Sequence, residues 1–110
     1  MWLLNVVQQL WQSDNLHEIA TQTADRCSGD IWERVSRRLT TMDVDEARGY
    51  IRCRAALLIA RELSENPLCK RLSDHQQHQL KQLALDISID IALVRKQTLV
   101  IQPMVVRRAA

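Results

Sequence analysis

The chain contains little glycine or proline, with two of each among 110 residues. These residues supply the backbone angles that tight turns need, so an all-β sandwich or barrel with many turns is not expected. The length, with 46% apolar and 25% charged residues, is typical of one compact domain with a single hydrophobic core. A chain of this size buries about two thirds of its surface without the help of disulfides or metal. We therefore expect an all-α fold.

The motifs that mark common enzymes are also missing. Two isolated glycines cannot form a phosphate-cradling loop. The three cysteines, Cys27, Cys53 and Cys69, include no C-x-x-C pair. His75 and His78 share a helix face near Cys69, but this zinc-ligand pattern is weak because a fourth ligand is lacking. We expect no catalytic activity, no cofactor and no metal.

No part of the chain resembles a targeting or membrane-spanning segment. The first residues carry no Lys or Arg before their apolar stretch, unlike a signal peptide. No run approaches the ~20 apolar residues that a bilayer crossing needs. An odd set of unpaired cysteines fits a reducing compartment. We predict a cytoplasmic protein that does not contact membranes.

The first 39 residues predict three short helices. The first has an amphipathic pattern, whose apolar positions are Trp2, Leu3, Val6, Val7, Leu10 and Trp11. The polar residues 13–15 are expected to end it. A second helix follows from Leu16 to Cys27, where Ser28 and Gly29 supply a stop signal. Asp30 then caps a third helix that reaches Leu39.

Two longer helices are predicted over 43–65 and 74–97, and both begin with a capping box. Asp43 is followed three residues later by Glu46, and Ser73 by Gln76 in the same way. Asn66 and Pro67 end the first of the two. We expect about five helices in all, built around a long antiparallel hairpin of 43–65 against 74–97.

The C-terminal third allows a different interpretation. Residues 83–93 alternate between apolar and polar as a half-buried strand does, and 99–106 could pair with them. Helix is favoured because the connecting residues 95–98 include none suited to a tight hairpin turn. The β-branched segment 99–110 is then expected to be an extended tail outside a domain formed by 1–98.

Four charged residues of the two long helices predict structural ion pairs. Arg54 and Arg61 start from a largely apolar neighbourhood on the first helix, and Asp86 and Asp90 do so on the second. A buried charge without a partner costs several kcal/mol, so we expect the two arginines to pair with the two aspartates. In the alternative, the arginine side chains extend along apolar surface to water.

Small side chains follow one stripe of the helix predicted over 43–65: Gly49, Cys53, Ala56 and Ala60. Glycine destabilises a helix interior by about 1 kcal/mol relative to alanine, which favours a packing reason for its presence. The stripe is interpreted as close packing within the chain, and the alternative is a seam between two copies.

Arginine makes up most of the positive charge, although the net charge is only +2. A local basic face of residues 34–54 is a candidate contact for anions or nucleic acid, through Arg34, Arg37, Arg38, Arg48 and Arg52. Interspersed acidic residues, and the lack of alternating aromatics, favour a solvated and neutralised surface instead. We therefore predict a non-catalytic protein–protein interaction module that self-associates, with nucleic-acid binding as the alternative. The self-association rests on the small-residue stripe, on Trp2 and Trp11, and on the β-branched tail.

Overall fold

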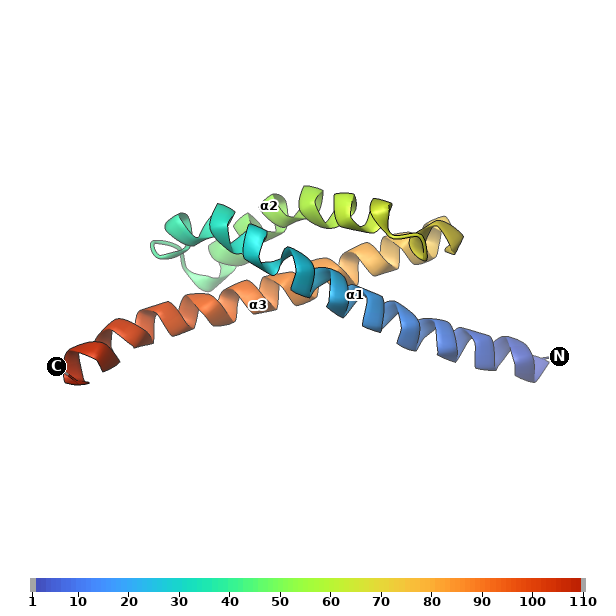
Figure 1. Cartoon of the computed structure of the whole chain (residues 1–110), viewed down its shortest axis with the longest axis horizontal. Helices are drawn as coiled ribbons and strands as arrows, with labels where there is room; N and C mark the ends of the chain where they lie inside the picture. Colours follow the sequence, from blue (N-terminus) through green and yellow to red (C-terminus); the bar gives the residue numbers. More distant parts are fainter. Residues whose placement is uncertain (1, 110) are drawn as a thin grey trace.

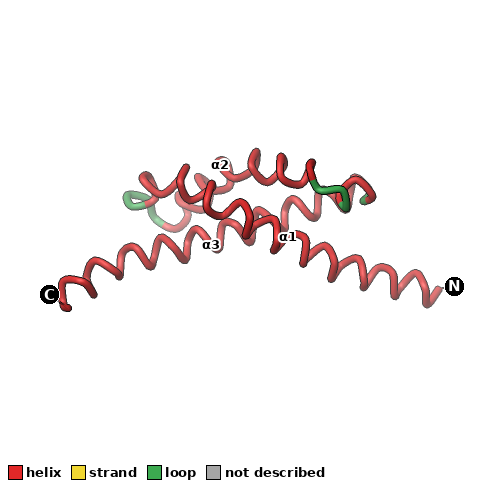
Figure 2. The backbone as a smooth tube through the Cα atoms, in the orientation of Figure 1, coloured by secondary structure: helices red, strands yellow, loops and turns green. Residues whose placement is uncertain are grey.

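The computed structural model describes the backbone of residues 2–109 and the side chains of residues 15–98. It contains three α-helices and a short 3₁₀ turn: α1 (Trp2–Leu39), α2 (Val44–Glu65), η1 (Cys69–Arg71) and α3 (Asp74–Ala109). Residues 2–109 contain no strand (Figure 2), so the all-α prediction is confirmed and 83–93 does not pair with 99–106 as a β-hairpin.

The three helices form a bundle in which the chain reverses direction twice. α2 runs antiparallel to both α1 and α3, and α1 crosses α3 (Figure 1). The predicted hairpin is present as α2 packed on α3, but α1 packs on both of them. The molecule is elongated, with extents of 65 × 25 × 23 Å.

The number of helices is three rather than about five, because α1 is continuous where two breaks were predicted. The helix passes through residues 13–15 and through Ser28 and Gly29 without interruption. Gly29 does not adopt a positive φ, and the Ser28 hydroxyl donates to the Asp25 carbonyl (2.9 Å) within the helix. Cys27 and Ile31, on either side of Gly29, are buried in one core. Packing of this face outweighs the low helix propensity of glycine.

The extended tail predicted after residue 98 is also wrong, because α3 continues to Ala109. Its β-branched residues have only a weak preference against helix. Pro103 removes one hydrogen bond from the helix, but its fixed φ of about −65° is compatible with helical backbone. The division into a domain of 1–98 and a tail of 99–110 stays a prediction.

The boundaries of α2 and the start of α3 follow the predicted caps. The Asp43 side chain accepts a hydrogen bond from the backbone N–H of Glu46 (2.8 Å). The Ser73 hydroxyl accepts one from the Gln76 N–H (3.2 Å), while the Ser73 N–H donates to the Gln76 side chain (3.0 Å). The Asp43 N-cap and the Ser73 capping box therefore supply partners for backbone groups that a helix end leaves free.

The core is built on one ridge of α2 that faces both other helices. This ridge repeats every fourth residue and is buried along its whole length: Ala47, Ile51, Ala55, Ile59 and Leu63. α1 and α3 bury complementary apolar residues against it, among them Ile31 and Val35 of α1 and Leu80 and Ile89 of α3. The opposite ridge of α2, which carries Leu57, therefore faces solvent, and Leu57 is 78% exposed.

Candidate interaction surfaces

The predicted ion pairs of Arg54 and Arg61 with Asp86 and Asp90 are not formed. Asp86 instead pairs with Arg52, with 3.2 Å between Nη2 and Oδ1. All four predicted residues are exposed, and within residues 15–98 Arg54, Arg61 and Asp90 have no ion pair. An exposed pair such as Arg52–Asp86 contributes about 0–1 kcal/mol, so these charges do not hold the bundle together.

The position of each arginine around α2 explains why the predicted ion pairs do not form. With the core ridge through Ile51 and Ile59, Arg52 lies on the flank toward α3. Arg54 lies on the flank toward α1, and Arg61 lies on the ridge opposite the core. Apolar and small residues surround α2 on nearly every side, so the sequence alone does not show which direction faces inward.

The small-residue stripe is divided between two surfaces. Ala56 and Ala60 are half-buried, whereas Gly49 and Cys53 are exposed on the outer ridge. A Cβ atom added at Gly49 would meet no atom within 4 Å. Close packing within the chain therefore does not explain Gly49.

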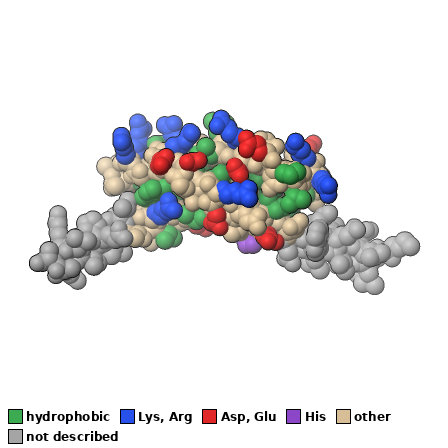
Figure 3. Space-filling view, viewed as in Figure 1, with side chains coloured by type: hydrophobic (Ala, Val, Ile, Leu, Met, Phe, Trp, Pro, Cys, Tyr) green, Lys and Arg blue, Asp and Glu red, His purple; other side chains and the backbone are tan. Residues whose placement is uncertain are grey.

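The basic face predicted for residues 34–54 lies over the end of α1 and the start of α2, where Lys and Arg side chains gather (Figure 3). All five predicted residues are exposed: Arg34, Arg37, Arg38, Arg48 and Arg52. Of these, within the described side chains, only Arg52 has a carboxylate oxygen within 4 Å.

Sequence reasoning missed an aromatic residue, Tyr50, beside the arginines on the α1 side of this face. The guanidinium carbons of Arg38 and Arg54 lie 6.0 and 5.4 Å from the centroid of the Tyr50 ring. The spacing of Tyr50 and Arg54, one helical turn apart, was a usable signal. The approach of Arg38 was not, because it depends on how α1 is registered against α2.

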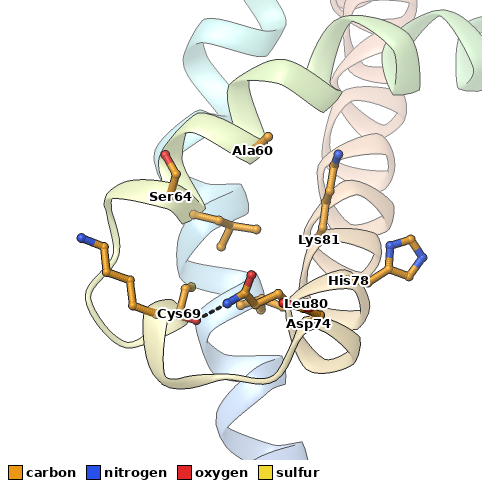
Figure 4. A pocket seen from close by; sticks show the side chains of 10 residues that line it. Ala60, Ser64, Cys69, Asp74, His78, Leu80 and Lys81 are labelled. Carbon is orange, nitrogen blue, oxygen red and sulfur yellow. Dashed lines mark hydrogen bonds between the residues drawn. The ribbon is translucent and has the colours of Figure 1, made fainter.

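A groove of about 500 Å³ lies where the end of α2, η1 and the start of α3 meet (Figure 4). Leu63, Cys69 and Leu80 give it an apolar lining. The Gln77 amide donates to the carbonyl oxygens of Cys69 (2.9 Å) and Leu72 (3.2 Å), which fixes the connection between the helices. His78 lies at the edge, and nowhere in the described residues do three His, Cys, Asp or Glu gather as metal ligands would.

Two of the three thiols are buried, and their pKa values are raised. Burial raises the pKa of Cys27, and the nearby carboxylates of Glu62 and Asp30 raise it further. Burial alone raises the pKa of Cys69. Since the thiolate is the nucleophile, neither cysteine is suited to covalent chemistry.

At the start of α2 the capping contact shifts the pKa values of two carboxyl groups in opposite directions. The pKa of Asp43 is lowered, chiefly because it accepts the hydrogen bond from the Glu46 N–H. The negative charge of Asp43 in turn raises the pKa of Glu46. The pair is occupied with the cap and does not neutralise the neighbouring arginines by ion pairing.

Comparison with known proteins finds no matching family model, no matching curated protein and no matching solved structure. Within residues 2–109, none of the helices has the length and apolar character that a bilayer crossing requires.

Proposed function

We propose that the chain is a non-catalytic helical interaction module that associates with a second copy through the projecting ends of α1 and α3. The supporting observation is that both helices extend beyond the bundle, at opposite ends (Figure 1). At 1.5 Å per residue, the 38 residues of α1 and the 36 of α3 span about 57 and 54 Å, against about 33 Å for α2. About 20 Å of each long helix therefore has no α2 beside it.

The projecting start of α1, residues 2–13, is called the N-arm. Its sequence places apolar residues on one side and Asn5, Gln8, Gln9 and Gln12 on the other. An amphipathic helix normally packs its apolar side against a partner, and the N-arm has no α2 beside it.

The projecting end of α3, residues 99–109, is called the C-arm. From 99 to 106 its only polar residue is Gln102, so apolar residues occur around the whole helix. A helix that is hydrophobic on all sides is normally buried. Each copy carries one arm of each kind, and a two-fold axis lets both arms of both copies be covered in one closed assembly.

Sedimentation velocity on two matched variants tests the proposal. Val6→Glu/Leu10→Glu changes the apolar side of the N-arm, and Gln8→Glu/Gln12→Glu makes the same charge change on its polar side. Burial of a Val or Leu side chain stabilises by about 1.5–3 kcal/mol, so the first variant is expected to weaken self-association at least ~100-fold. The second variant is expected to sediment as the wild type does.

A wild-type chain that is helical by circular dichroism and monomeric at about 200 μM, where about 95% of the chain is dimeric for a Kd near 1 μM, contradicts the proposal. So does an equal loss of association in both variants. We further propose a cytoplasmic location, because Cys27, Cys53 and Cys69 are all free thiols.

A further inference from the structure

We propose that Arg38 and Arg54, which lie over the Tyr50 ring, form together with Arg34 a binding site for a phosphate group, either inorganic phosphate or a phosphomonoester. The site lies on the seam between α1 and α2, within the described part of the bundle and apart from both arms. It is therefore independent of the proposed self-association.

Two of the arginines are brought together by the tyrosine. Arg38 comes from the last turn of α1 and Arg54 from α2, and the guanidinium of each lies over the Tyr50 ring, at 6.0 and 5.4 Å. Their guanidinium carbons are therefore no farther apart than these two distances together. The half-buried ring attracts both cations, by an interaction that does not neutralise them.

The register of α1 on α2 places the third arginine beside them. The helices are antiparallel, and two contacts fix the register: Arg26 pairs with Glu62 at 3.4 Å, and Arg38 faces Tyr50. In an antiparallel pair of helices, residues at the same level have residue numbers with a constant sum. The sum is the same for both contacts, and the numbers of Arg34 and Arg54 give this sum as well. Arg34 is therefore opposite Arg54, one helical turn before Arg38 on the same flank of α1.

Among residues 15–98, no acidic side chain forms an ion pair with these three cations. Arg34, Arg38 and Arg54 have no carboxylate oxygen within 4 Å in the described residues. The acidic residues one turn away on the same flanks are Asp30 of α1 and Glu46 of α2, and neither pairs with them. Like charges on the two sides of this seam repel one another, and a bound anion reduces that repulsion.

Phosphate fits this arrangement better than a carboxylate does. A phosphomonoester carries about −1.5 to −2 charge at neutral pH and presents three strong acceptor oxygens, whereas a carboxylate carries one charge on two oxygens. Guanidinium groups bind such oxygens in pairs. Three guanidiniums from the two helices thus supply enough positive charge and N–H donors to bind one phosphate group.

The same geometry fits a nucleic-acid strand less well than a single phosphate group. A strand needs a basic track several phosphates long, whereas the start of α2 carries Asp43, Asp45 and Glu46. Bases also need a free aromatic face for stacking, and the Tyr50 ring is already approached by two guanidiniums.

Titration calorimetry at about 20 mM salt, where charge contacts are little screened, tests the site with inorganic phosphate and phenyl phosphate as probes. Arg38→Gln/Arg54→Gln removes two charges from the site. Arg37→Gln/Arg61→Gln removes two charges from exposed positions outside it, and is the matched control. We expect the wild type and the control to bind equally and the site variant to bind at least 10-fold more weakly. Arg38→Lys/Arg54→Lys keeps the charge and is expected to weaken binding as well, because lysine does not bind oxygens in pairs.

Tighter binding of phenyl phosphate than of inorganic phosphate assigns the site to an ester, and equal binding assigns it to the free ion. An equal loss of phosphate affinity in the two glutamine variants, both shown to be folded by circular dichroism, overturns the proposal, because binding would then depend only on net charge. The absence of a heat of binding to the wild type at phosphate concentrations up to about 20 mM, 20-fold above a weak Kd of about 1 mM, overturns it too. Equal binding of a hexanucleotide with and without a 5′-phosphate overturns it in favour of backbone recognition.

Discussion

The three cysteines give a direct test of how the helices are arranged, because the fold places them in different environments. Cys53 is exposed on the outer ridge of α2, whereas Cys27 and Cys69 are 6% and 5% exposed. Burial also raises the pKa of both buried thiols, which lowers the fraction present as reactive thiolate. Alkylation of the reduced protein is expected to show one fast thiol and two slow ones.

The size of the difference follows from how a reagent reaches a buried thiol. It reacts only in molecules that have opened, and for an opening free energy of about 5 kcal/mol the open fraction is below about 10⁻³. Cys27 and Cys69 are therefore expected to react at least ~1,000-fold more slowly than Cys53. Cys69 should be the faster of the two, since it lies in the short connection after α2, whereas Cys27 packs between helices with its Sγ 3.9 Å from the Leu58 carbonyl oxygen.

Iodoacetamide labelling followed by peptide mass spectrometry measures all three rates. Cys53→Ser should remove the fast phase and leave both slow phases unchanged. The fast rate should also be independent of protein concentration, because the proposed assembly leaves the outer ridge of α2 free. Three comparable rates, or a fast phase assigned to Cys27, would refute the arrangement of α1 and α2.

Three further predictions concern stability, measured by urea unfolding. The folded-state pKa values of Cys27 and Cys69 are raised. The stability that the two protonated thiols contribute is therefore fully present below the ordinary thiol pKa of about 8.5, and it is lost as pH rises through the folded-state values. Cys27→Ala should reduce this loss of stability between pH 8 and 10.5, and an unchanged pH profile would contradict the prediction. Gly49→Ala should stabilise by about 0.5–1 kcal/mol, because the added Cβ meets no atom within 4 Å, and should leave self-association unchanged; weaker association in this variant would favour a seam at the small-residue stripe. Ile59→Ala should destabilise by about 2–5 kcal/mol and Leu57→Ala by less than about 0.5 kcal/mol, because Ile59 is fully buried and Leu57 is 78% exposed; similar values for both would show that the core faces a different side of α2.

The features predicted correctly from the sequence are those encoded locally. The capping boxes of Asp43 and Ser73 depend on residues three positions apart, and both helices begin where these signals occur. The wrong break at Gly29 has the opposite origin. A glycine after a serine is a local stop signal, but Cys27 and Ile31 bury one continuous face of α1, and the sequence does not show how much that burial stabilises.

The candidate surfaces were only partly predictable, because they depend on register between helices. Asp86 was expected to meet arginine from the preceding helix, and it does, but the partner is Arg52 rather than Arg54 or Arg61. Choosing among them requires the direction of the core around α2, which the pattern of apolar residues leaves open. The meeting of Arg38 with Tyr50 depends in addition on the length of the turn after α1, for which the sequence gives no measure.

Hydrogen exchange at two protein concentrations tests the central claim, that the projecting arms are covered by a second copy. At about 100 μM, well above a micromolar Kd, the amides of residues 2–13 and 99–109 should exchange slowly, and at about 0.1 μM they should exchange nearly as fast as in an isolated helix, which is marginally stable at this length. The amides of α2 should exchange at the same rate in both samples. Exchange in both arms that is fast at every concentration would contradict the account.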